Sequence, residues 1–177
     1  GRMMVTDCGA ESNMHYSADL TRTTPVGGKF SQRQKEIYEI VLKANTEAIK
    51  TAGPGISNRD LHLGACKIIA SGLKDLGFMK GDVDEAVAAG AHALFMPHGL
   101  GHMMGLDVHD MEALGENHVG YNDEVKRSTQ FGLRSLRFAL PYKPGHVFTV
   151  EPGIYFIPEL VAKWKGEGLH REFINYE

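Results

Sequence analysis

The residues best able to do chemistry gather between positions 98 and 110. His98-Gly-Leu-Gly-His102 is followed by His109, so three histidines fall within twelve residues. Histidine is both a metal ligand and a proton carrier near neutral pH, and glycines let the backbone approach a ligand closely. The spacing therefore indicates a metal-binding or catalytic segment, whereas scattered surface or core histidines are the alternative.

Two aspartates near the start of the chain are the next candidates. Asp7 ends a strand predicted over residues 3–7, and Asp19 lies twelve positions later in a strand predicted between residues 15 and 26. An antiparallel pair can bring two such carboxylates onto one face, where they repel unless a proton or cation lies between them. Aspartate is depleted inside strands, which favours metal binding at Asp19. Surface or turn carboxylates are the alternative.

Glu151 is a further candidate, because it ends an apolar strand predicted over residues 146–151. Pro152-Gly153 follows directly and bends the chain, as often happens at a ligand site. A partly buried glutamate needs a partner of opposite charge. That partner is either a metal ion or a lysine or arginine side chain.

These candidates combine into an oxygen-rich set with one imidazole: Asp7, Asp19, His102 and Glu151. Such a set suits Mn²⁺, Fe²⁺, Co²⁺ or Zn²⁺ and differs from a structural thiolate zinc site. Two bridged ions about 3.5 Å apart would activate a shared water and stabilise a tetrahedral intermediate.

Three helices are predicted between these segments. Ser31 and Gln34 have capping-box spacing, and apolar residues then recur at helical intervals until Gly53. A second helix is predicted from about residue 58 to 76 and a third over residues 83–89. Strands are predicted over residues 132–140 as well as 146–151. This order of strands, helices and strands predicts an α+β domain.

Composition excludes several other classes. The 177 residues fit one domain, with 42% apolar and 23% charged residues, as in soluble globular proteins. A net charge of −3 without basic runs points away from nucleic acid and anionic membranes. The two cysteines, Cys8 and Cys66, are interpreted as buried thiols in a reducing compartment. No apolar stretch approaches the ~20 residues that span a bilayer, and no signal peptide is visible, so we expect a cytoplasmic protein.

The motifs resemble those of the proline-specific pita-bread metallopeptidases, namely Xaa-Pro aminopeptidase (aminopeptidase P) and prolidase. Five stretches in the family's order cover nearly the whole chain: Asp7-Cys-Gly, Ala18-Asp-Leu-Thr-Arg-Thr, His98-Gly-Leu-Gly-His102, Gly105-Leu-Asp-Val-His-Asp110 and Thr149-Val-Glu-Pro-Gly-Ile-Tyr155. Methionine aminopeptidases share the fold, but the Gly-Leu-Asp-Val-His-Asp stretch favours the proline-specific branch. The resemblance implies a pita-bread fold, a proline-containing peptide substrate and a homo-oligomer, most simply a dimer, for the full-length protein.

The resemblance also implies two divalent ions, usually manganese. Asp7 would bind one ion, and Asp19 would bridge both. His102 and Glu151 would bind the other ion, and Glu151 would also help to take the proton from the attacking water.

The catalytic roles implied by the resemblance fall to Glu151 and two histidines. His98 and His109 would contact the substrate and stabilise or protonate groups around the scissile Xaa-Pro bond. An aminopeptidase is favoured, with a dipeptidase as the alternative. A metal-free enzyme like creatinase and a non-catalytic binding module are weaker alternatives, because such relatives lack the acidic ligands that this chain carries.

One family feature has no match in the sequence. The family has a second bridging glutamate on a strand after the equivalent of Glu151, and the later glutamates lack its context: Glu159, Glu167, Glu172 and Glu177. We therefore expect residues 1–177 to be an incomplete catalytic domain, without a preceding N-terminal domain and the final strands. We expect this chain alone to bind metal weakly and to have little or no peptidase activity.

Overall fold

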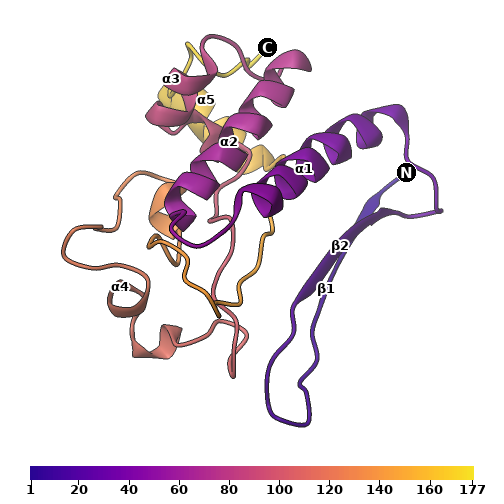
Figure 1. Cartoon of the computed structure of the whole chain (residues 1–177). Helices are drawn as coiled ribbons and strands as arrows, with labels where there is room; N and C mark the ends of the chain where they lie inside the picture. Colours follow the sequence, from indigo (N-terminus) through magenta and orange to yellow (C-terminus); the bar gives the residue numbers. More distant parts are fainter.

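The computed structural model describes residues 1–177 and contains one two-stranded antiparallel sheet (Figure 1). Strand β1 (Met3–Cys8) pairs with strand β2 (Leu20–Pro25), and Asp7 lies opposite Thr21. Most residues of both strands are exposed to solvent. The hairpin forms a long arm beside the helical part of the molecule (Figure 1).

Two long helices follow the hairpin, and the first begins at the predicted capping box. Helix α1 (Gln32–Thr51) starts with a complete capping box between Ser31 and Gln34. Helix α2 (Asn58–Asp75) starts after Ser57, whose side chain accepts a hydrogen bond from the first turn. Each cap satisfies amide groups that have no partner within the helix. Both helix predictions are confirmed.

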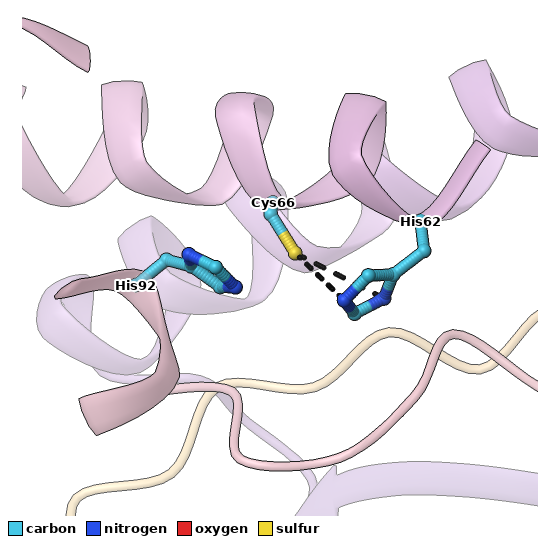
Figure 2. Close-up of side chains that lie close together, drawn as sticks. All are labelled: His62, Cys66 and His92. Carbon is cyan, nitrogen blue, oxygen red and sulfur yellow. Dashed lines mark hydrogen bonds between the residues drawn. The ribbon is translucent and has the colours of Figure 1, made fainter. Parts of the chain in front are cut away.

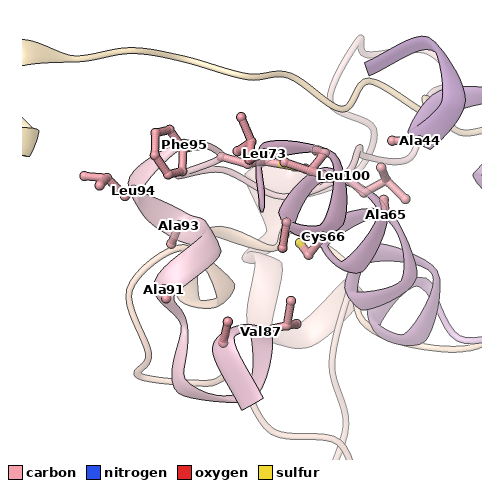
Figure 3. Close-up of a cluster of buried hydrophobic side chains, with 14 of the residues drawn as sticks. Ala44, Ala65, Cys66, Leu73, Val87, Ala91, Ala93, Leu94, Phe95 and Leu100 are labelled. Atoms are coloured by element: carbon pink, nitrogen blue, oxygen red, sulfur yellow. The ribbon is translucent and has the colours of Figure 1, made fainter. Parts of the chain in front are cut away.

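The core forms where α1 and α2 meet the segment that follows them. Ile40 lies directly over Gly72, where an added Cβ would come within 2.6 Å of the Ile40 side chain. Small residues thus let the two helices approach closely. Figure 3 shows the α2 side chains facing the segment from 87 to 100. The largest fully buried apolar side chains are Ile69, Leu73, Leu94, Met96, Leu100, Leu136 and Ile174.

Shorter helices complete the fold. Helix α3 (Val83–Ala89) matches its predicted range, is capped by Asp82 and leads through Gly90 into the 3-10 helix η1 (Ala91–Leu94). Helix α5 (Pro158–Glu167) was not predicted. The remaining single turns are η2 (Glu112–Leu114), α4 (Glu116–Val119) and η3 (Leu133–Ser135). No helix is both long enough and apolar enough to cross a membrane.

The strand predicted over residues 132–140 is wrong. The segment contains η3 and irregular backbone. Side chains satisfy its carbonyl groups in place of a neighbouring strand: Leu136 O accepts hydrogen bonds from Tyr121 and Arg127, and Phe138 O accepts one from Asn58. A ladder partner is therefore unnecessary here.

The strand predicted over residues 146–151 is extended but belongs to no sheet. It lies against residues 100–104 with a single bridge, between Met103 and Phe148.

The prediction that both thiols are buried was wrong for Cys8, which is exposed at the end of β1, whereas Cys66 is buried as expected.

Candidate metal centre

Two extended segments bring His102 and Glu151 side by side. The amide of Thr149 donates to His102 O at 2.9 Å, and the amide of Glu151 donates to Leu100 O at 2.8 Å. A Cβ added to Gly101 would lie 2.1 Å from the carbonyl oxygen of Thr149. Glycine between the two motif histidines is therefore required by the close approach of two backbones.

Asp19, His102 and Glu151 form what we call the carboxylate site. His102 Nε2 lies 3.1 Å from Asp19 Oδ2 and 3.2 Å from Glu151 Oε1. One ligand atom from each of the three residues lies within 4.8 Å of the others. The His102 side chain is 4% exposed, that of Asp19 17% and that of Glu151 39%, so the site opens to solvent on the glutamate side.

The protonation of the carboxylate site is governed by hydrogen bonds among its members and from Thr149. Burial alone would lower the pKa of His102, but hydrogen bonds to Glu151, Met103 O and Asp19 raise it to about 8. Burial likewise would raise the pKa of Glu151, but hydrogen bonds from His102 and Thr149 lower it. A proton held on His102 between two carboxylates balances their charge. The same donor set, two carboxylates and one imidazole, fits a divalent transition metal.

Supporting contacts orient the two candidate ligands His102 and Glu151. His102 Nδ1 donates to Met103 O at 3.0 Å, which leaves Nε2 facing the carboxylates. The Thr149 hydroxyl donates to Glu151 Oε1 at 2.7 Å and accepts from the His102 amide at 3.0 Å. Sequence reasoning did not single out Thr149, although its place on the same predicted strand face as Glu151 was a usable signal. Such outer contacts tune a metal site.

Asp7 lies outside this group of three. It opposes Thr21 in the hairpin, and Asp19 precedes β2, so the prediction that Asp19 lies inside the paired strand is wrong. The two aspartates are nevertheless diagonal neighbours on one face of the hairpin. Together with burial and the charge of Glu151, the charge of Asp7 raises the pKa of Tyr155. The structure therefore brings Asp19, His102 and Glu151 together and leaves Asp7 outside that group.

His98 and His109 both line the pocket in front of the carboxylate site. The His109 ring lies edge-on to that of His102 with centroids 4.3 Å apart, and the His98 ring packs against Tyr155 at 5.3 Å. His98 Nδ1 donates to Gly99 O at 2.7 Å, while its Nε2 is buried without a hydrogen-bond partner. That nitrogen is free to bind another group.

The pocket has a volume of about 470 Å³ and a strongly basic wall that sequence reasoning missed. Arg127, Arg134 and Arg137 line it. Arg137 pairs with Glu112 at 2.5 Å, and Arg127 pairs with Glu116. Arg134 pairs with no carboxylate; its guanidinium lies over the Phe131 ring.

Comparison with known proteins identifies the family. The profile of metallopeptidase family M24 matches residues 1–173. The chain belongs to this family. A probable Xaa-Pro aminopeptidase of Fusarium vanettenii is 43% identical over 172 residues, which are 97% of this chain and 35% of that protein. The human Xaa-Pro dipeptidase is 40% identical over 177 residues, which are 100% of this chain and 34% of that protein.

The structure of this M24 chain resembles solved aminopeptidases. Zinc-substituted Escherichia coli aminopeptidase P in complex with product matches 89% of the chain and 31% of its own length, with a TM-score of 0.72 and 39% identity. The α+β pita-bread fold is thereby confirmed. The chain spans about a third of the length of the curated relatives that it matches.

Proposed function

We propose that the protein hydrolyses the Xaa-Pro bond at the N-terminus of peptides with the help of two divalent metal ions. The observation that carries this proposal is the convergence of Asp19, His102 and Glu151 beside a pocket lined by His98 and His109. Its relatives in family M24 are named for Xaa-Pro cleavage, which supports the same substrate class.

The ions would be held by the carboxylate site together with Asp7 from the hairpin. When bound, they would supply an activated water and neutralise the charge that develops on the scissile carbonyl oxygen. Manganese is the metal that we propose, because hard oxygen donors outnumber the single imidazole. Cobalt, zinc or iron would suit the same donors.

The proposed roles of the protein side chains follow from their contacts. Glu151 would accept a proton from the attacking water, and Thr149 holds that carboxylate in place. His98, with Nδ1 already donating to Gly99 O, would present Nε2 to the substrate. His109 would stabilise or protonate groups at the scissile bond from its place beside His102.

A dipeptidase activity is the second candidate, and the basic pocket wall favours it. A dipeptide carries its free carboxylate close to the scissile bond. Guanidinium groups pair well with carboxylates, and Arg134 is not engaged by an acidic side chain. Arg134→Gln would therefore raise KM for a dipeptide more than for a tripeptide.

The deciding experiment compares Ala-Pro with Ala-Pro-Ala as substrates of the complete gene product with added Mn²⁺. Faster cleavage of the tripeptide supports the aminopeptidase, and exclusive cleavage of the dipeptide supports the dipeptidase. Elemental analysis of the same sample tests the weaker alternatives. Two equivalents of a transition metal support the metallopeptidase, whereas none supports a metal-free enzyme or a binding module.

We further propose a homodimer in the cytoplasm. Large apolar side chains exposed on the hairpin support association, because a partner subunit would remove them from water: Met4, Val5, Tyr16 and Leu20. The unpaired thiols of Cys8 and Cys66 suit a reducing compartment. Light scattering of the eluted protein measures the mass, and cell fractionation tests the location.

A further inference from the structure

A second group of ligand-type side chains lies inside the helical core, away from the pocket. Helix α2 carries His62 and Cys66 four residues apart, so both project from the same face. His92 comes from η1 and points toward them (Figure 2). We call these three residues the Cys66 cluster. Each is 0% exposed.

The distances within the Cys66 cluster are close to those of a metal site. Cys66 Sγ lies 3.5 Å from His62 Nε2, and one ligand atom from each of the three residues lies within 4.8 Å of the others. The centre of such a triangle is at most about 2.8 Å from each atom. Zinc binds nitrogen at ~2.0–2.1 Å and thiolate at ~2.3 Å. Side-chain shifts below about 1 Å would therefore bring all three atoms into bonding distance.

A second observation, independent of these distances, favours a ligand at this position. Both ring nitrogens of His92 are buried and make no hydrogen bond of normal geometry, although the backbone of Val87 lies close enough to affect the pKa of His92. The only partner of the His62 nitrogens is the weakly polar sulfur of Cys66. Buried nitrogen atoms without partners are costly and rare, and an unseen ion or water is a common reason for them. A leucine would fill the same space without this cost.

We propose that His62, Cys66 and His92 bind a single Zn²⁺ ion that stabilises the packing of α2 against η1. Binding replaces the S–H bond of Cys66 with an S–Zn bond, and the thiol proton leaves to solvent. The two imidazoles bind as neutral ligands through their lone pairs. One thiolate and two imidazoles suit zinc, whereas the carboxylate site has no sulfur and prefers harder ions.

The test uses Co²⁺ as a spectroscopic probe for zinc. The reduced complete gene product is refolded with increasing Co²⁺, because a buried site is filled most readily during folding. We expect a thiolate-to-cobalt charge-transfer band in the near ultraviolet that saturates at one equivalent and disappears on adding Zn²⁺. The carboxylate site cannot produce this band, so the result is independent of the proposed peptidase function.

Matched variants assign the band to its ligands. Cys8→Ser changes the exposed thiol and should keep the band, whereas Cys66→Ser should lose it. His92→Leu should weaken Co²⁺ binding at least tenfold and abolish any rise in Tm on adding Zn²⁺, while circular dichroism confirms the fold. Absence of the band in wild-type protein with reduced thiols would overturn the proposal, as would a band that follows Cys8. A buried water at His92 would give the first of these results.

Discussion

The carboxylate site and the Cys66 cluster each bring three ligand-type residues together, but they differ in how their polar atoms are satisfied. In the carboxylate site, His102 already contacts both carboxylates, and Thr149 supports Glu151. In the Cys66 cluster, the nitrogens of His92 make no hydrogen bond of normal geometry. The carboxylate site is therefore stable without an ion and is suited to exchange an ion with solvent. An ion in the Cys66 cluster would mainly increase the stability of the fold.

The largest effect should come from removing the shared imidazole of the carboxylate site. His102→Ala leaves two carboxylates without their common partner. Changes in outer contacts cost ~10–100-fold in metal affinity, and loss of a direct ligand should exceed that range. Titration calorimetry of the complete gene product with Mn²⁺ measures the effect. The exposed His118→Ala serves as the control, and equal affinities for both variants would contradict the assignment.

A substitution at Gly101 should disturb the same site, because it separates the two extended segments that carry His102 and Glu151. In Gly101→Ala, the new Cβ meets the Thr149 carbonyl at 2.1 Å and must push the two extended segments apart. We expect a loss of about 1–3 kcal/mol in the free energy of unfolding, measured with urea.

Gly64→Ala is the matched control for that change. Gly64 lies inside α2 with open space around its Cβ position, so alanine there should stabilise the protein by about 0.5–1 kcal/mol. If both alanine variants unfold at the same urea concentration, the close approach at Gly101 is not a constraint.

A smaller effect is expected from Thr149→Val, which keeps the shape and removes the hydroxyl. Glu151 loses its 2.7 Å hydrogen bond, so its orientation loosens. Metal affinity should fall about tenfold. Thr46→Val, which breaks a hydroxyl contact within α1, should leave the affinity unchanged. A tenfold loss in both variants would mean that the effect is not local to Glu151.

The smallest effect is expected in the Cys66 cluster, where a substitution should raise the free energy of unfolding. With a chelator present, His92→Leu replaces two unpartnered nitrogens by an apolar side chain of similar size. The free energy of unfolding should rise by about 1 kcal/mol. His118→Leu on the surface should change it by less than about 0.5 kcal/mol. A destabilised His92→Leu protein would show that the nitrogens are satisfied by buried water.

The sequence predicted helices well because their signals are local. The capping box at Ser31 and the apolar spacing predict α1 and α2 without knowledge of the rest of the chain. Helix α5 carried comparable signals in Pro158 at its start and Gly168 after its end, which the interpretation overlooked. Its few apolar residues give a weak pattern, with only Trp164 buried.

Contacts between distant segments were harder to predict. The alternation over residues 146–151 correctly indicated extended backbone, but its partner is the segment 100–104, which has no strand pattern. Two members of the Cys66 cluster, His62 and Cys66, lie four residues apart on helix α2, and this spacing is visible in the sequence. His92 joins them only through the turn after α3, which no local pattern specifies.

The hairpin has a consequence for any affinity measured at the carboxylate site. Asp19 reaches His102 from an arm whose loop is further held by hydrogen bonds from Ser17 to Gly105 O and Leu106 O. Elements with few buried contacts open more readily than the core. The apparent dissociation constant equals the intrinsic one divided by the fraction of molecules with the arm docked. The apparent affinity for an ion at this site therefore also depends on the fraction of molecules in which the arm is docked.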